Sequence, residues 1–280
     1  MNDRLTIFDL VKAKQENRKI VAVSCYDYTT ACLVARSDVD MILVGDSAAQ
    51  VVLGHDTTLP ATMDFMVPLT AAVRKGAPHV FLVADMPFLS YQVSVSEAVR
   101  NAGRFVVEAG AQMVKIEVTS AYEKVVREVS QAGISVMAHI GIRPQRILKA
   151  GRLRAEGTTA DMATELIELA DRMIQVGADA LLIEGTAAEV AALIAERAAV
   201  PAISCGSGAQ CDGQVLIAPD ILGLTQEPKP KFAMSFGHLA EDAIAAFNAY
   251  SKSVRTGTYP DEQHSYHMKT GETDRLRSFL

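Results

Sequence analysis

Short apolar runs recur along the chain, each preceded by a segment with helical spacing and a turn that contains glycine. The repeat is visible in RKGAPHVFLVAD (74–85), EAGAQMVKIE (108–117) and QVGADALLIEG (175–185). Each apolar run spans four or five residues and ends in a polar one, which is the pattern of a strand buried on both faces. Strands of this kind that alternate with helices predict an α/β protein with parallel strands.

Eight such runs are predicted as strands: residues 20–24, 41–44, 80–84, 113–116, 135–138, 180–183, 202–204 and 215–217. Eight strands alternating with helices in 280 residues predict a single (β/α)8 TIM barrel. An open doubly wound sheet is the alternative, but no G-x-G-x-x-G follows the first strand. The barrel domain is expected to cover residues 1–258, and the polar residues 259–280 are expected to form a surface tail or an arm between subunits.

The ends of the helices are marked by local signals. A short helix near residues 6–14 is expected to close one end of the barrel, and residues 241–254 have the spacing of a final amphipathic helix. Glycines at positions 76, 110, 133 and 177 stand where helices commonly end in a left-handed residue. Capping boxes predict helix starts at Ser94, Ser120 and Thr186. Residues 228–232, PKPKF, are expected to be a loop.

Composition and charge narrow the class of function. Hydrophobic residues make up 49% of the chain and charged residues 21%, which is ordinary for a packed globular enzyme. A formal net charge of -6 gives no basic footprint for nucleic acid or an anionic membrane, so a small-molecule substrate is expected. The four cysteines lack C-x-x-C spacing, and no apolar segment reaches the ~18 residues of a membrane span. A cytoplasmic location is therefore expected.

Polar residues stand at the predicted strand ends, which a barrel would turn into one mouth: Asp46, Ser47, Asp85, Lys115, Glu117, His139 and Glu184. The carboxylates of Asp46, Asp85 and Glu117 cannot share a small volume uncompensated, because like charges raise each other's pKa. Oxygen ligands on adjacent strands favour Mg²⁺ over Zn²⁺. His139 could favour a transition metal or act as a hydrogen-bonding or proton-relay group, and Mn²⁺ and Co²⁺ remain open as alternatives.

Two further residues have the placement that catalysis needs. Lys115 and Glu117 alternate with apolar residues, so both side chains lie on one face of their strand, where a barrel interior would require them to be paired or functional. Glu184 ends the sixth strand, across the mouth from the carboxylates of strands two to four, and is the candidate general base. Taken singly, Asp85 could cap a helix, Glu117 could pair with Lys115, and Glu184 could form a salt bridge.

A series of motifs in fixed order carries a resemblance that spans residues 5–267: YDYTTA (26–31), LVGDS (43–47), GHDTTLP (54–60), ADMPF (84–88), MVKIE (113–117), AHIGIRPQ (138–145), DGQVL (212–216), PKF (230–232) and HSYH (264–267). With these motifs the chain resembles the ketopantoate hydroxymethyltransferases, also called 3-methyl-2-oxobutanoate hydroxymethyltransferases, of pantothenate biosynthesis. The resemblance implies transfer of a one-carbon unit from 5,10-methylenetetrahydrofolate to 3-methyl-2-oxobutanoate, giving 2-dehydropantoate through a Mg-stabilised enolate.

The resemblance also implies residue roles and an assembly. Mg²⁺ would be held by Asp46, Asp85 and Glu117. The 2-oxoacid would contact Asp46, Ser47, Asp85 and Lys115. Glu184 matches the proton acceptor, Lys115 would add positive charge beside the substrate, and His139 would orient groups or shuttle protons. Family members are typically homo-oligomers, often decamers.

The chain departs from the family pattern at several loops. Ala48-Ala49 replaces Leu-Gly, Val118-Thr119 replaces Gly-Gly, residues 204–209 replace GIGAGN, and residues 148–152 replace a GGY-like segment. These changes leave open two other interpretations: a Mg-dependent aldolase or lyase acting on another 2-oxoacid without folate, and a catalytically silent paralogue that binds a metabolite. A silent paralogue would not exchange the C3 proton of the oxoacid. An aldolase or lyase would exchange this proton but would not use methylenetetrahydrofolate.

Overall fold

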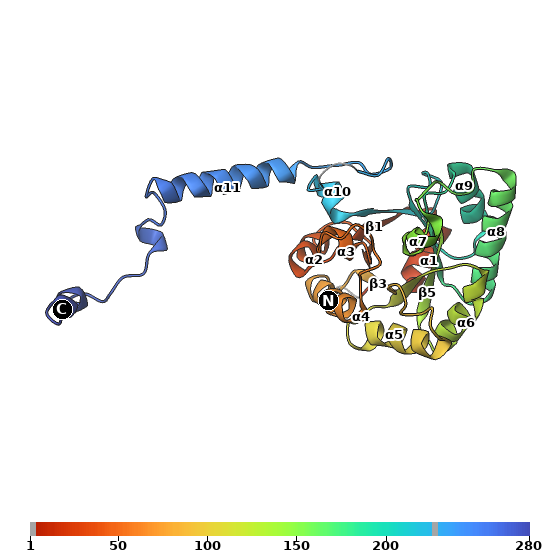
Figure 1. The fold of residues 1–280 in the computed structure, drawn as a ribbon, viewed down its shortest axis with the longest axis horizontal. Helices are drawn as coiled ribbons and strands as arrows, with labels where there is room; N and C mark the ends of the chain where they lie inside the picture. Colours follow the sequence, from red (N-terminus) through yellow and green to blue (C-terminus); the bar gives the residue numbers. More distant parts are fainter. Residues whose placement is uncertain (1–3, 226–228) are drawn as a thin grey trace.

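The computed structural model describes residues 4–225 and 229–280. Within these residues, eight parallel strands close into one barrel in the order β1 to β8, and β8 pairs with β1 (Figure 1). The strands are β1 (Ile20–Ser24), β2 (Met41–Val44), β3 (Phe81–Asp85), β4 (Met113–Glu117), β5 (Ser135–Gly141), β6 (Ala180–Glu184), β7 (Ala202–Cys205) and β8 (Gly213–Ile217). The prediction of a single (β/α)8 barrel is confirmed, and the largest difference is at β5, which runs on to Gly141.

The helices that connect successive strands lie on the outer side of the barrel. The α-helices are α1 (Ile7–Gln15), α2 (Tyr28–Val34), α3 (Ala48–Val51), α4 (Met63–Gly76), α5 (Val95–Val107), α6 (Glu123–Gln131), α7 (Ile147–Ala150), α8 (Ala160–Gln175), α9 (Ala188–Arg197), α10 (Ala218–Leu222), α11 (Leu239–Arg255) and α12 (Glu272–Arg277). The 3-10 turns are η1 (Ser120–Tyr122), η2 (Pro144–Arg146) and η3 (Glu262–His264). Helix α4 contacts β2 and β3, α5 contacts β4, α6 and α8 contact β5, and α9 contacts β7.

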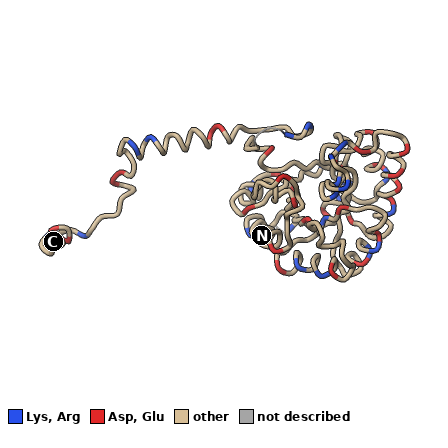
Figure 2. The backbone as a smooth tube through the Cα atoms, in the orientation of Figure 1, with Lys and Arg blue, Asp and Glu red and all other residues tan. Residues whose placement is uncertain are grey.

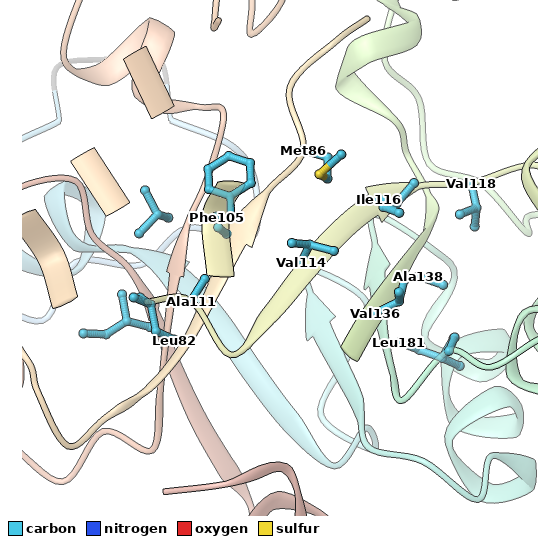
Figure 3. Packing of buried hydrophobic residues seen from close by; sticks show 14 of the residues in the cluster. Leu82, Met86, Phe105, Ala111, Val114, Ile116, Val118, Val136, Ala138 and Leu181 are labelled. Atoms are coloured by element: carbon cyan, nitrogen blue, oxygen red, sulfur yellow. The ribbon is translucent and has the colours of Figure 1, made fainter. Parts of the chain in front are cut away.

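Alternation along the strands divides the apolar residues between two cores. In β2, Met41 and Leu43 belong to the core inside the barrel, whereas Ile42 and Val44 pack outward against the helices. Figure 3 shows part of the outer core, including Val114 of β4. Leu10 of α1 is buried with the inner core, so the predicted N-terminal helix does close one end of the barrel. Each strand is therefore packed on both faces. The polar residues at the carboxyl ends of the strands lie at the end of the barrel opposite α1.

Three of the four glycines predicted to end helices have the expected backbone. Gly110, Gly133 and Gly177 have φ of 70°, 85° and 109°. The prediction for Gly76 is wrong, because Gly76 is the last residue of α4 and is not among the glycines with positive φ. A Cβ at Gly76 would lie 2.6 Å from the carbonyl oxygen of Tyr28 in α2. Glycine is needed there because α2 and α4 pack closely together.

Only one of the three predicted capping boxes starts a helix as expected. The Ser94 hydroxyl accepts a hydrogen bond from the amide of Glu97 (3.2 Å) at the start of α5. The prediction at Ser120 is wrong, since this residue lies inside η1, a turn capped by the preceding Thr119. The prediction at Thr186 is also wrong. Its hydroxyl donates to the carbonyl of Glu184 (3.2 Å), and α9 begins without a side-chain cap.

The C-terminal part of the chain leaves the barrel after β8. Helix α10 is short, and the following α11 extends away from the barrel, in blue in Figure 1. The predicted final helix is confirmed, but none of its residues is buried. Pro228 of the predicted PKPKF loop lies outside the described residues, and residues 229–232 contain neither helix nor strand. No helix in the described ranges is both long and apolar enough to cross a membrane.

Candidate active site

The polar residues predicted from the strand ends gather around one cavity. This cavity has a volume of about 410 Å³ and lies at the carboxyl ends of the strands. It is lined by every predicted site residue: Asp46, Ser47, Asp85, Lys115, Glu117, His139 and Glu184. The strand register explains the grouping, because Asp85 pairs with Lys115, Glu117 with His139, and Gly141 with Glu184, all at the carboxyl ends of these strands.

Three buried side chains form the centre of the site. The backbone amide of Asp46 donates to Asp85 Oδ2 (2.9 Å), which ties the end of β3 to the loop after β2. Lys115 Nζ lies 3.0 Å from Asp85 Oδ1 and forms a buried ion pair. Oδ1 nevertheless has no hydrogen-bond partner of suitable geometry among the described residues. Lys115 thus faces the barrel interior, as the alternation of β4 predicted, and is paired there with Asp85.

The site carries more negative than positive charge. Burial, together with the neighbouring carboxylate of Asp85, raises the pKa of Asp46 to about 7. Burial also raises the pKa of Glu117 well above its ordinary value. For Lys115, burial alone would lower the pKa, but the surrounding carboxylates, Asp85 first, outweigh it and raise the pKa. One ammonium therefore faces several buried carboxyl groups, and some of these must be protonated or compensated in another way.

His139 connects the lysine to the candidate base. Its Nδ1 lies 3.0 Å from Lys115 Nζ, and its Nε2 lies 3.4 Å from Glu184 Oε2 without forming a hydrogen bond. Burial and the positive charges of Lys115 and Arg143 lower the pKa of His139 well below its ordinary value, so the imidazole is neutral. Because the ammonium of Lys115 can only donate, Nδ1 accepts and the ring proton lies on Nε2, facing Glu184.

Glu184 has the electrostatic setting of a general base. Burial raises the pKa of its carboxyl group to about 7, although Lys115 partly opposes this rise. The side chain keeps 19% of its surface exposed and lines the cavity, so a substrate can reach it. A carboxylate with a pKa near neutrality is a stronger base than an ordinary one and is still ionised in part at pH 7. Glu184 can therefore accept and return a proton under ordinary conditions.

Sequence reasoning assigned no role to Gln145, which is the residue that joins the site together. Its side-chain amide donates to Asp46 Oδ2 (2.9 Å) and to the carbonyl of Met86 (2.9 Å). Its backbone amide lies 3.2 Å from both carboxylate oxygens of Glu117, and its Oε1 accepts from Tyr91 Oη (2.8 Å). The motif AHIGIRPQ ends on this residue, but no periodicity indicates that a turn after β5 folds back into the mouth.

Two other residues, one behind the cavity wall and one lining it, were also left unassigned. Tyr26 Oη lies 2.8 Å from Ser47 Oγ, which fixes the hydroxyl at the end of β2. Asp220, just after β8, is 3% exposed and lines the cavity, and its Oδ1 has no partner among the described residues. Tyr26 belongs to the motif YDYTTA, which could have indicated a role for it. Asp220 lies beyond the last residue of β8, so the alternation along that strand could not indicate it.

Comparison with known proteins gives one consistent result. A family model described as ketopantoate hydroxymethyltransferase matches residues 4–262. The chain belongs to the ketopantoate hydroxymethyltransferase family. It is similar to the 3-methyl-2-oxobutanoate hydroxymethyltransferases of Hyperthermus butylicus (45% identity; 99% of this chain, 96% of the relative) and Pelobacter propionicus (45% identity; 95% and 98%). Members of this family are transferases, so the expectation of an enzyme is confirmed.

A solved structure outside the ketopantoate hydroxymethyltransferase family has the same fold. Phosphonopyruvate hydrolase, in a complex with oxalate and Mg²⁺, superposes with a TM-score of 0.59 over 98% of both chains. The two sequences are 14% identical. At that level the likeness extends to the barrel alone.

The donor set in this family member fits a divalent cation. Asp46, Asp85 and Glu117 offer carboxylate oxygens, which are the ligands that Mg²⁺ prefers. Asp85 Oδ1, which is ion-paired with Lys115 but accepts no hydrogen bond from the described residues, and the excess of buried negative charge are both suited to a cation. In the part of the chain that the structure describes, however, no three His, Cys, Asp or Glu side chains lie close enough to hold a metal. Glu117 is instead bonded to the amide of Gln145.

Most departures from the family pattern lie away from the cavity. Ala48, Ala49 and Val118 are fully buried in the outer core between strands and helices, where Figure 3 includes Val118. Cys205, in the substituted segment 204–209, by contrast lines the cavity at the end of β7. The substitution that can alter ligand binding directly is therefore the one at Cys205, because Ala48, Ala49 and Val118 affect packing.

Proposed function

We propose that the chain transfers a one-carbon unit from 5,10-methylenetetrahydrofolate to 3-methyl-2-oxobutanoate, giving 2-dehydropantoate for the pantothenate pathway. A new bond joins C3 of the oxoacid to the methylene carbon, the bonds from that carbon to the folate nitrogens break, and water supplies the hydroxyl oxygen. The observation that carries the proposal is the position of Glu184, which faces the cavity with a pKa raised to about 7. Two relatives named for this activity, each 45% identical, support it.

We place Mg²⁺ on Asp46, Asp85 and Glu117. The phosphonopyruvate hydrolase structure is a complex with the same ion and with oxalate, a small dicarboxylate, on the same fold. When bound, the ion would supply a Lewis acid for the keto and carboxylate oxygens of the oxoacid. The ionised ligands would also be compensated, because a cation opposes the rise in pKa that burial and like charges cause.

Glu184 is the residue that removes the proton from C3. Its carboxylate lies on β6, across the cavity from Asp46 and Asp85, so a substrate held by the latter residues would present its C3 side to Glu184. The Nε2–H of His139 lies 3.4 Å from Glu184 Oε2 and forms no hydrogen bond in the structure, but a small rotation of the carboxylate would let it donate one and stabilise the charged form. Return of the proton by the same pair would complete the cycle.

Lys115 and Ser47 complete the oxoacid site. The buried ammonium of Lys115 adds positive charge where the enolate develops, and such fixed charge in a dry site stabilises the transition state strongly. Tyr26 holds the Ser47 hydroxyl at 2.8 Å, which leaves it placed to donate to an oxoacid oxygen. Asp46 and Asp85 belong to the same oxoacid site as proposed ligands of the cation.

The test is exchange of the C3 proton of 3-methyl-2-oxobutanoate in D₂O, followed by NMR with and without Mg²⁺. We expect Mg²⁺-dependent exchange in the wild type, none in Glu184→Gln, and unchanged exchange in Glu165→Gln, whose carboxyl is exposed on α8. Exchange without any use of methylenetetrahydrofolate would favour the aldolase or lyase interpretation. Absence of exchange from the folded wild type would reject the proposed substrate.

We propose that the enzyme works as a homo-oligomer, up to a decamer, in the cytoplasm. The apolar residues of α11, among them Ile244 (59% exposed) and Phe247 (70%), are left uncovered by the described part of their own chain. Val21 of β1 pairs with Gln214 of β8, and both residues are exposed on the outer side of the barrel. The short α10 does not cover this part of the barrel. A second copy can cover this face with its own α11.

The four free cysteines agree with a reducing compartment.

Light scattering after size exclusion tests the assembly. Phe247→Asp is expected to reduce the assembly mass, because a charge would be buried in the contact. Asn248→Asp, at the next position of the same helix, adds the same charge on another face and serves as the control. A monomeric wild type would contradict the proposal.

A further inference from the structure

The wall of the catalytic cavity beside Glu184 is apolar. Inward-facing side chains of β6, β7 and β8 form this wall, and they are Leu182, Cys205 and Val215, which all line the cavity. Leu182 and Val215 belong to the inner core, and Cys205 packs against that core. Strands β7 and β8 contain no charged residue, whereas basic residues gather around α7, in the loop after β5 (Figure 2). This part of the mouth is therefore suited to the apolar end of a ligand.

The strand register places Cys205 directly beside the candidate base. Glu184 at the end of β6 pairs with Cys205 at the end of β7, and on its other side with Gly141 of β5. Because residues of β6 and β7 alternate between the outer and the inner core, the side chains of Glu184 and Cys205 both point into the barrel. Gly141 has no side chain, and a Cβ there would clash with the carbonyl oxygen of Glu184. Of these two neighbours, Cys205 is the one that shapes the space next to the carboxylate.

The thiol of Cys205 acts here as a small apolar group. Burial raises the pKa of this thiol well above its ordinary value, and the charge of Glu184 adds to the rise, which agrees with the close approach of the two side chains. The thiol is therefore neutral at pH 7, and a neutral buried cysteine behaves as a small hydrophobic residue. It is also smaller than Leu182 and Val215 on either side of it, so the wall is lowest at Cys205.

We propose that Cys205 sets the size of the substituents that the enzyme accepts at C3 of its 2-oxoacid. This inference rests on the proposed function, in which Glu184 removes the C3 proton. Proton transfer requires C3 to lie beside the Glu184 carboxylate, so the groups bonded to C3 lie against the wall next to it. An ethyl group can take the place of a methyl group there, because the side chain of Cys205 is short.

The experiment measures C3 exchange in D₂O, with Mg²⁺ and without folate, for 3-methyl-2-oxobutanoate and for racemic 3-methyl-2-oxopentanoate, which is one methylene longer. The quantity compared is the ratio of kcat/KM for the longer acid to kcat/KM for the shorter one. We expect the wild type to exchange both acids, with a ratio between about 0.3 and 3. Cys205→Ile fills the space and should lower the ratio about tenfold or more, as a closed pocket does for one extra methylene. Cys205→Ala should raise the ratio about threefold.

Two further variants make the comparison independent of any single substitution. Cys205→Val adds less volume than isoleucine, and its ratio should lie between those of the wild type and Cys205→Ile. Cys32→Ile makes the same exchange of residues on α2, away from the residues that line the cavity, and should keep the wild-type ratio. A purely structural role of Cys205 would lower the exchange of both acids equally and leave the ratio unchanged.

The ratio separates this inference from the proposed function. A ratio that stays within about twofold in the wild type and all three Cys205 variants would overturn the inference and leave the proposed function intact. The inference is also overturned if the wild type exchanges the shorter acid but discriminates against the longer one by more than about tenfold. A folded wild type that exchanges neither acid would reject the proposed oxoacid chemistry, and the size limit with it.

Discussion

The raised pKa of Glu184 makes a prediction about stability as well as catalysis. A carboxyl group with a pKa of about 7 in the folded enzyme and 4.5 in the unfolded chain binds its proton more tightly when folded. Folding then costs free energy once the group is ionised. The shift of about 2.5 pKa units corresponds to about 3 kcal/mol, and since 19% of the side chain is exposed we expect about 1–3 kcal/mol.

The sign of this contribution fixes its dependence on pH. Below pH 4.5 the group is protonated in both states and costs nothing, while above pH 7 the full cost applies. Glu184→Gln, which keeps the size of the side chain and removes its charge, should therefore be more stable than the wild type at pH 8. The advantage should shrink as the pH falls from 7 to 4.5.

Urea denaturation at pH 4.5, 6 and 8, in the presence of EDTA, measures the difference. The chelator matters because a bound cation would itself favour the charged carboxylate. Glu165→Gln, at an exposed position, should change the free energy of unfolding by less than about 0.5 kcal/mol at every pH. A Glu184→Gln protein that is less stable than the wild type, or whose advantage does not depend on pH, would refute the electrostatic reasoning.

Gln145→Met is expected to lower the free energy of unfolding by about 2–4 kcal/mol, because Asp46 Oδ2 and the buried carbonyl of Met86 lose the hydrogen bonds that the Gln145 amide donates. An unchanged urea midpoint would contradict this. Lys115→Met leaves Asp85 without its ion-pair partner and should cost about 3–5 kcal/mol and abolish C3 exchange; full exchange in this variant would exclude the proposed role. Mg²⁺ at 100 times its Kd should stabilise the wild type by about 2.7 kcal/mol in thermal unfolding, but not Asp46→Asn, and an equal shift in both would place the ion elsewhere.

The barrel and its polar mouth could be predicted because both depend on short-range pattern. Runs such as 113–117 are apolar apart from Lys115 and Glu117, and the two-residue period places both on the inner face. The closure of eight strands then brings residues far apart in sequence, such as Asp46 and Glu184, to one cavity. Fold class and the composition of the site follow from this periodicity together with the general geometry of barrels.

The connections made by loops could not be predicted in the same way. Gln145 lies in a 3-10 turn whose path depends on the tertiary contacts it makes, so its bonds to Asp46 and Glu117 leave no periodic signal. The hydroxyl of Thr186 bonds to the Glu184 carbonyl at the end of β6, a choice that a capping-box pattern cannot reveal. The spacing of α11 gave its length and apolar face, but carried no information on which surface that face would cover.

The most direct test of the proposed function is product formation from 3-methyl-2-oxobutanoate and 5,10-methylenetetrahydrofolate, followed by mass spectrometry with a ¹³C-labelled methylene group. We predict labelled 2-dehydropantoate and an equal amount of tetrahydrofolate, dependent on Mg²⁺ and absent in Glu184→Gln. Unlabelled oxoacid recovered intact from the folded enzyme with Mg²⁺, or cleavage of a 2-oxoacid that needs no folate, would contradict the proposed reaction.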